Sequence, residues 1–325
     1  MICVLAGGVG AAKFLSGLVR AVPASEVTAV VNVGDDLDLH GLRVCPDLDT
    51  VTYTLAGAVN PETGWGRAHE TWNVMEGMER FGASTWFRLG DRDIATHLYR
   101  TERLRAGAGL AEVTAEIARA WGLRLHLVPA TEDELRTMVT VAEGAERHEV
   151  SFQEYFVQRR HSVPVASIRF AGAETAYPAP CVLEAVVRSE AVVIAPSNPV
   201  VSIDPILAVQ GLREAVGARR ERVVAVSPII GGAALKGPAD RLLRELGHES
   251  SAVGVAHWYA PIAGTLVIDE VDADLAPAVE AAGMRCIVAP AVMSDPGRAE
   301  ALARVVLAAA GAPVDAAAAE RAPRG

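Results

Sequence analysis

The sequence predicts an α/β fold: a doubly wound, mostly parallel, Rossmann-like sheet with a smaller inserted helical and antiparallel lobe. Short runs rich in β-branched residues recur, and each ends in glycine, proline, serine or asparagine before a helical pattern begins. The runs are almost continuously apolar, which is typical of parallel strands covered on both faces. The chain has 325 residues, of which 51% are hydrophobic, so it is long and apolar enough to bury a large core.

At least six strands are predicted in this way, at residues 2–6, 27–32, 192–195, 223–226, 265–268 and 286–289. Two of them lie near the start of the chain and four lie after residue 190, so the stretch between them is expected to form helical cover or a separate lobe. We therefore assign residues 1–60 and 178–312 to a nucleotide-binding α/β core and residues 61–177 to an inserted helical and partly β lobe. The alanine-rich residues 313–325 are predicted to form a disordered tail.

The inserted segment changes its periodicity along its length. Residues 61–122 are predicted to be largely helical, and residues 110–121 carry apolar side chains at three- and four-residue steps, the pattern of a helix with one buried face. Residues 138–141 and 150–152 are separated by a polar stretch containing glycine, which predicts a β-hairpin. We expect a partly antiparallel lobe at about residues 123–177.

The net charge limits the kinds of molecule that the protein is expected to bind. Thirty basic and forty acidic residues give a net charge of −10, and no basic run is present, which argues against a nucleic-acid partner. A nucleotide stays possible, because backbone N–H groups and one or two cations suffice to hold phosphates. No apolar run approaches the roughly 18 residues of a membrane span, and no export signal is evident, so we expect a cytoplasmic protein without a membrane partner.

The first predicted strand leads into a glycine turn that opens a helix. This turn contains Gly8, Gly10 and Lys13. The N–H groups at the start of a helix favour a phosphate, and a lysine one turn later adds a positive charge. The third glycine of the dinucleotide fingerprint is replaced by Lys13, and the Gly-Lys-Ser/Thr of a P-loop is absent from the sequence. We predict phosphate binding, with a simple tight turn and a solvated lysine as the alternative.

Five aspartates follow the second predicted strand within fifteen residues: Asp35, Asp36, Asp38, Asp47 and Asp49. Ligands of open α/β sheets bind at the carboxyl ends of the strands, where these acids are expected. Carboxylates with this spacing can hold a divalent cation or accept a proton from a substrate hydroxyl. The alternatives are solvated turn residues, a contact to the ribose of NAD, and capping by Asp49 and Thr50 of a helix that begins near residue 51.

Further polar side chains are expected at the same edge of the sheet. Arg88 precedes a segment rich in arginine and aspartate, and we predict that it points into the cleft. Ser197 and Asn198 directly follow one strand, and residues 227–231, from Ser227 to Gly231, follow the next. Either turn alone could be ordinary turn chemistry. Together with the glycine turn they place three donor-rich turns on one rim, as the phosphates and base of a mononucleotide require.

Six motifs in order resemble those of a known family. They are AGGVG at 6–10, NVGDD at 32–36, CPDLDT at 45–50, LGDRDIATH at 89–97, APSNP at 195–199 and SPIIG at 227–231. In this order they resemble the 2-phospho-L-lactate transferases of coenzyme F-420 biosynthesis, the CofD-like family, whose actinobacterial members are called FbiA. The resemblance covers residues 1 to about 310, and HGLRVC at 40–45 together with the alanine- and arginine-rich composition is closer to the actinobacterial type.

This resemblance implies a transferase that moves a phosphoenolpyruvyl or 2-phospho-L-lactyl group from a guanosine-diphosphate-activated donor to the hydroxyl of the deazaflavin Fo. The products would be F-420-0, or its dehydro form, and GMP. The resemblance also implies that Asp49 and Arg88 contact Fo, and relatives lead us to expect a homodimer. Such a transfer depends on positioning and on neutralisation of charge more than on a protein nucleophile.

These implications assign a role to each candidate residue. Asp49 is the expected catalytic residue, and Mg²⁺ is placed among Asp36, Asp47 and Asp49. The diphosphate is placed on Gly8, Gly10 and Lys13, and the guanosine on the turns that contain Ser197, Asn198, Ser227 and Gly231.

Two other functions fit part of the sequence. A non-catalytic regulator of the same fold that binds a nucleotide-sugar would share the nucleotide-binding turns, but the motifs at 45–50 and 88–93 favour the transferase. An NAD-dependent oxidoreductase would share the glycine turn. It predicts a third glycine at position 13 and a dehydrogenase-like second half, and neither is evident.

Overall fold

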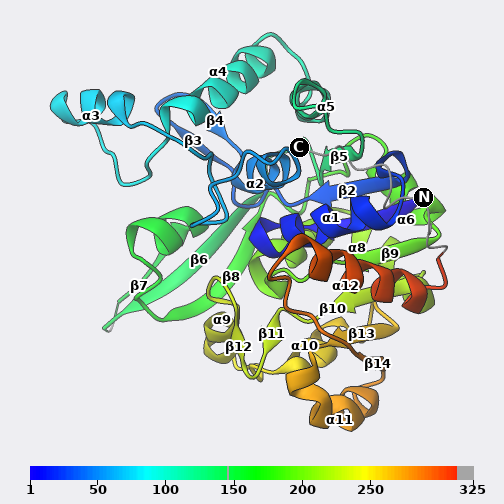
Figure 1. The fold of residues 1–325 in the computed structure, drawn as a ribbon. Helices are drawn as coiled ribbons and strands as arrows, with labels where there is room; N and C mark the ends of the chain where they lie inside the picture. Colours follow the sequence, from blue (N-terminus) through cyan, green and yellow to red (C-terminus); the bar gives the residue numbers. More distant parts are fainter. Residues whose placement is uncertain (145, 313–325) are drawn as a thin grey trace.

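A seven-stranded parallel sheet forms the centre of the molecule, with the strand order β14-β13-β10-β9-β1-β2-β5 (Figure 1). The computed structural model describes residues 1–144 and 146–312, so the predicted tail at 313–325 lies outside the described residues. The strands of this sheet are β1 (Ile2–Ala6), β2 (Val27–Val31), β5 (His126–Pro129), β9 (Ala191–Ile194), β10 (Val223–Val226), β13 (Thr265–Ile268) and β14 (Arg285–Val288). Every neighbouring pair is parallel, and the predicted α/β fold is confirmed.

The six predicted strands are all present, with ends displaced by no more than one residue. Every residue of β1, β2, β9, β10 and β13 is buried, which explains their continuous apolar character. The seventh strand, β5, was not predicted. It has four residues, begins with the exposed His126 and pairs with β2 at the sheet edge. Although β5 lies within residues 61–177, it belongs to the central sheet and not to a separate lobe.

Helices cover the sheet, and α1 (Gly8–Ala21) lies beside α12 (Pro296–Ala309) on one face (Figure 1). Helix α2 (Pro46–Leu55) packs against α1. Shorter helices follow later strands: α6 (Val182–Arg188), α7 (Asp204–Ala208), α8 (Leu212–Gly217), α9 (Ala239–Glu245), α10 (Ala252–Tyr259) and α11 (Ala276–Ala281). None of the helices among the described residues is both long and apolar enough to cross a membrane.

A three-stranded antiparallel sheet, β7-β6-β8, extends from the core (Figure 1). Its strands are β6 (Arg136–Glu143), β7 (Glu146–Ser151) and β8 (Val165–Ala171). The predicted hairpin is confirmed, because residues 138–141 of β6 pair with residues 148–151 of β7. One turn of π-helix at Glu154–Gln158 follows β7.

A second, outer group of elements consists of helices and small hairpins. It contains β3 (Leu37–Leu39), β4 (Leu42–Val44), α3 (Asn73–Arg80), α4 (Asp91–Arg105) and α5 (Leu110–Ala120). The helix predicted at 110–121 is therefore confirmed, whereas residues 81–90 contain no helix. A separate apolar cluster joins β4 to the helices through Val44, Met75, Leu89 and Ile94. The remaining strands, β11 (Ile229–Ile230) and β12 (Ala233–Ala234), form a short hairpin near the sheet edge.

The close packing of α1 against α12 depends on a glycine. A Cβ at Gly17 would lie 2.2 Å from the backbone carbon of Ala299, and backbone atoms cannot rotate away. We expect Gly17→Ala to lower the free energy of unfolding by about 1–3 kcal/mol, measured by urea denaturation. Gly77→Ala in α3 is the matched control, because nothing lies within 4 Å of its Cβ position. It should raise stability by up to about 1 kcal/mol through helix propensity. Equal effects of the two substitutions would contradict this packing.

Candidate active site

A cavity of about 760 Å³ lies where the loops after β1, β2, β9 and β10 meet. These loops leave the carboxyl ends of the parallel strands, the edge where ligands of such sheets bind. The opposite walls come from the antiparallel lobe, through Phe152 and Phe156, and from the outer helical group. The cavity thus lies between the central sheet and the segments inserted into it.

Most of the predicted site residues line this cavity: Gly8, Gly10, Lys13, Asp47, Asp49, Arg88, Ser197, Asn198 and Ser227. Two predicted residues are not among those that line it. The Gly231 N–H donates to the Asp272 carboxylate at 3.0 and 3.1 Å, and Asp36 faces Arg43, whose Nη2 lies 3.4 Å from Asp36 Oδ2. Asp35, the neighbour of Asp36, lines the cavity in its place.

The floor of the cavity is formed by two turns that touch through their backbones. A Cβ at residue 10 would lie 2.0 Å from the Pro196 carbonyl oxygen, so only glycine permits this approach. Ser197 Oγ donates to the Gly7 carbonyl at 2.8 Å and ties the same turns together. Gly8 adopts a left-handed φ of 68° at the start of α1. The glycines predicted to admit a phosphate are therefore also required for packing.

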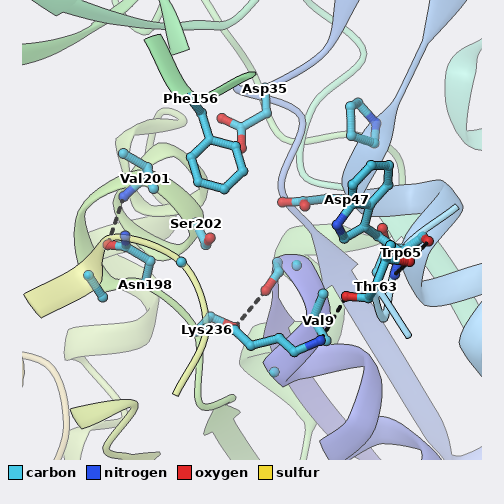
Figure 2. A pocket seen from close by; sticks show the side chains of 18 of the residues that line it. Val9, Asp35, Asp47, Thr63, Trp65, Phe156, Asn198, Val201, Ser202 and Lys236 are labelled. Atoms are coloured by element: carbon cyan, nitrogen blue, oxygen red, sulfur yellow. Dashed lines mark hydrogen bonds between the residues drawn. The ribbon is translucent and has the colours of Figure 1, made fainter. Parts of the chain in front are cut away.

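Asp35 and Asp47 direct their carboxylates into the same part of the cavity (Figure 2). Both are buried. Burial raises the pKa of Asp47 to about 6, although Asn32 and the Gly8 N–H donate to it. Burial also raises the pKa of Asp35 well above its ordinary value, and the nearby Asp47 charge raises it further. Asp35 Oδ1 is buried without a hydrogen-bond partner. Two buried acids with unmet negative charge form a site that fits a divalent cation.

Asp47 and Asp49 lie in the first turn of α2, because the helix begins at Pro46. The alternative in which Asp49 and Thr50 cap a helix starting near residue 51 is therefore wrong. Proline at the first helical position has a fixed φ that suits a helix start, and its missing N–H is not needed there. This earlier start turns both carboxylates towards the cavity.

Asp49 forms an ion pair with the buried Arg100 of α4. Both guanidinium Nη atoms contact its carboxylate, with Nη1 3.2 Å from Oδ2 and Nη2 in contact with Oδ1. Arg100 also contacts His97 Nδ1 at 3.3 Å. Bidentate pairing of this kind fixes the orientation of the carboxylate. Burial favours the neutral guanidine, but the charge and hydrogen bonds of Asp49, together with other nearby acidic groups such as Asp36, outweigh it and raise the pKa of Arg100.

The ion pair continues into a polar network on α4. His97 Nε2 lies 3.3 Å from Asp93 Oδ2, and Tyr53 OH donates to Asp93 Oδ1 at 2.5 Å. Burial would raise the pKa of Asp93, but hydrogen bonds from His97 and Tyr53 prevail and lower it. Within residues 1–144 and 146–312, Asp49, Asp93 and His97 are the one group of three possible metal ligands whose atoms lie within 4.8 Å of one another. The predicted metal ligands Asp36, Asp47 and Asp49 are not gathered in this way.

Part of the cavity wall is aromatic, which the sequence patterns did not predict. Trp65, Trp72, Trp86 and Phe87 line the cavity together with Arg88. The Arg88 guanidinium lies 4.5 Å from the centre of the Trp72 ring, a cation–π contact. A usable signal was present, because three of the five tryptophans in the sequence fall between residues 65 and 86. An aromatic wall with one cation suits a flat, conjugated ligand that carries polar edges.

Comparisons with known proteins give relatives by sequence and by structure. A family model described as 2-phospho-L-lactate transferase CofD matches residues 2–300. A phosphoenolpyruvate transferase of Streptomyces coelicolor is 46% identical over 308 residues, covering 94% of this chain and 97% of the relative. A protein of the same name from Mycolicibacterium smegmatis is 41% identical over 322 residues, covering 95% and 98%. The crystal structure of protein BH3568 from Bacillus halodurans has a TM-score of 0.63 at 18% identity, covering 94% of this chain and 98% of that one. It shows a shared fold.

Removal of Arg100 should leave the buried Asp49 charge without its partner. We expect Arg100→Met to lower the free energy of unfolding by about 3–5 kcal/mol, the usual cost of breaking a buried pair from one side. Arg103→Met on the same helix is the control, because Arg103 forms its ion pairs with Glu112 and Glu116 at the surface. Its effect should be much smaller. Urea denaturation of both variants measures the difference, and similar losses would argue against the buried pair.

Asp35→Asn should stabilise the protein in a pH-dependent way. The folded state raises the pKa of Asp35, so the folded form holds this proton more tightly than the unfolded form does. The acid therefore reduces stability as pH rises above about 4, its ordinary pKa. In buffer with EDTA, the melting temperature of Asp35→Asn should exceed that of the wild type at pH 8, and the gap should narrow towards pH 4. If the difference in melting temperature between the variant and the wild type does not change with pH, the pKa of Asp35 is not raised in the folded state.

Proposed function

The chain belongs to the CofD family of 2-phospho-L-lactate transferases, and from this premise we propose that it transfers a phosphoenolpyruvyl group to the hydroxyl of the deazaflavin Fo. The donor is the guanosine-diphosphate-activated form of the three-carbon acid, and GMP is the second product. The enolpyruvyl donor is preferred over the 2-phospho-L-lactyl donor because relatives named phosphoenolpyruvate transferase are 41–47% identical over nearly their whole length. The homodimer and the cytoplasmic location stay predictions.

The observation that carries this proposal is that one cavity has two chemically different kinds of wall. One part of the wall has the N-terminus of α1, Lys13 and the two acids Asp35 and Asp47, a setting for phosphates and a cation. Another part has Arg88 over the Trp72 ring, with Trp86 and Phe87 in the same wall, a setting for a conjugated ring. A donor with a diphosphate and a flat acceptor can therefore meet between them.

The guanosine end of the donor is proposed to lie on the turns after β9 and β10. Several polar groups there are already used within the protein: Asn198 Oδ1 accepts from the Val200 N–H at 3.0 Å, and Ser227 Oγ donates to the Ile229 carbonyl at 2.9 Å. Asn198 Nδ2, however, is buried without a hydrogen-bond partner. This amide is a free donor at the cavity wall, and a ligand acceptor would satisfy it.

A divalent cation fits the pair formed by Asp35 and Asp47, because both acids are buried and raised in pKa, so that ionisation is costly without a cation, and Asp35 Oδ1 has no hydrogen-bond partner. We propose Mg²⁺ at these residues, which exchanges Asp36 for Asp35 in the predicted ligand set. When bound, the ion supplies neutralisation of charge on the transferred phosphoryl group. Asp49 is left out of this set because Arg100 already engages both of its oxygens.

Asp49 is proposed as the catalytic residue that orients the acceptor. Its carboxylate is fixed by Arg100 and faces the cavity, so it accepts a hydrogen bond from the Fo hydroxyl and then its proton. The hydroxyl oxygen forms a bond to the phosphorus that carries the three-carbon acid, and the bond from that phosphorus to the GMP oxygen breaks. Arg88 contacts Fo from the aromatic part of the wall, held in place over Trp72.

A transfer assay tests this function. Incubation with Fo, Mg²⁺ and enolpyruvyl diphosphoguanosine should produce dehydro-F-420-0 and GMP, detected by mass spectrometry. The lactyl donor is run in parallel to decide between the two three-carbon acids. Arg88→Met should raise the KM for Fo by about tenfold, the loss of one charged contact, and leave the KM for the donor unchanged. Arg80→Met on the exposed end of α3 is the matched control.

Two results would decide against the transferase. Folded protein that forms no product from either donor, while Fo fluorescence still changes on binding, would identify a non-catalytic binding protein. An equal rise of both KM values in Arg88→Met would place Arg88 outside the acceptor site.

A further inference from the structure

The chain contains only two lysines, Lys13 and Lys236, among its 30 basic residues. All the others are arginines. Both lysines line the same cavity, although one lies on α1 and the other follows β12. The two amines are thus concentrated at one site in a protein that otherwise uses guanidinium groups. A lysine ammonium differs from a guanidinium in being a compact point charge whose donors can turn towards a new partner.

Lys236 reaches across the cavity to another segment of the chain. Its Nζ donates to the Thr63 carbonyl at 2.7 Å, and Figure 2 shows the side chain passing Val9 on the way. A Cβ at Gly64 would lie 3.0 Å from both this nitrogen and Val9 Cγ1. Lys236 therefore lies directly beside the glycine turn that is proposed to hold the donor diphosphate.

Lys236 is exposed, and within the described residues its ammonium is recorded with one neutral partner. Thr63 contributes a neutral carbonyl oxygen, and in the described part of the chain neither lysine forms an ion pair with a carboxylate. An ionised phosphate oxygen adds the Coulomb attraction of opposite charges to the hydrogen bond, which a neutral carbonyl oxygen does not supply. A diphosphate that enters beside Val9 is therefore a better partner for Lys236 than the carbonyl.

We propose that Lys236 is a second cationic ligand of the donor diphosphate, acting with Lys13, and that its bond to Thr63 is a resting contact that the diphosphate replaces. This inference rests on the proposed function, since it assumes a guanosine-diphosphate donor in this cavity. It adds a binding residue from the loop between β12 and α9, where the sequence motifs assigned none. It also links donor binding to the segment that carries Trp65, a residue of the same cavity wall.

The scarcity of lysine makes a direct test possible. Reductive methylation with ¹³C-formaldehyde labels three amines: Lys13, Lys236 and the amino terminus, which is paired with Glu190 and does not line the cavity. Titration of the wild-type protein with guanosine diphosphate should shift both lysine resonances and leave the terminal one unchanged. Lys236→Met assigns its signal and should weaken guanosine diphosphate binding about tenfold or more by calorimetry. Lys236→Arg keeps the charge and should recover part of the affinity.

The outcomes separate this inference from the proposed function. If guanosine diphosphate binds and shifts the Lys13 signal alone, or if Lys236→Met binds it as tightly as the wild type, Lys236 is not a diphosphate ligand and the proposed function stands. If the wild type does not bind guanosine diphosphate, both the proposed donor and this inference fail. Should Lys236→Met fail to fold, the wild-type titration and Lys236→Arg still decide the question.

Discussion

The approach of the glycine turn to the Pro196 carbonyl is the constraint on which the cavity depends. The oxygen occupies nearly the position that a Cβ at Gly10 would take, and Ser197 fastens the same turns through Gly7. Two loops from different strands are therefore held as one rigid floor. The start of α1 and the carboxylate of Asp47 are placed on this floor. Any ligand that enters thus meets donors and acids in fixed positions.

Above this floor the protein buries acids in two different ways. Asp49 is matched by Arg100, a pairing that costs desolvation on both sides and gives a carboxylate of fixed orientation. Asp35 and Asp47 are buried with no such cation, and the pKa of each is raised. Perturbed groups of this kind concentrate at functional sites, because their stability cost is met when a ligand binds. The first arrangement is thus suited to orienting a substrate, and the second is suited to a cation.

The fold and most of the cavity could be predicted because they depend on local pattern. Strands buried on both faces are continuously apolar. In a parallel sheet the loops that follow the strands all lie at the carboxyl edge, so their residues can be placed there without further information. Which of Asp35 and Asp36 lines the cavity could not be predicted, because it depends on a contact outside the cavity. Asp36 forms an ion pair with Arg43 and is not part of the cavity wall. Arg100 was missed because its partner Asp49 lies 51 residues earlier in the chain. β5 was missed because it begins with the exposed His126 and ends in Pro129, so it lacks the continuous apolar pattern of the predicted strands.

The contact between Lys236 and Thr63 is made to the main chain. Every residue type presents the same carbonyl oxygen, so this contact does not itself require a particular side chain at position 63. Gly64 beside it is less free, since it has a φ of 78° and lies against both Val9 and the lysine nitrogen. Comparison of side chains among homologues would therefore overlook position 63 as a partner of Lys236. Backbone partners of this kind are found from coordinates and not from patterns of substitution.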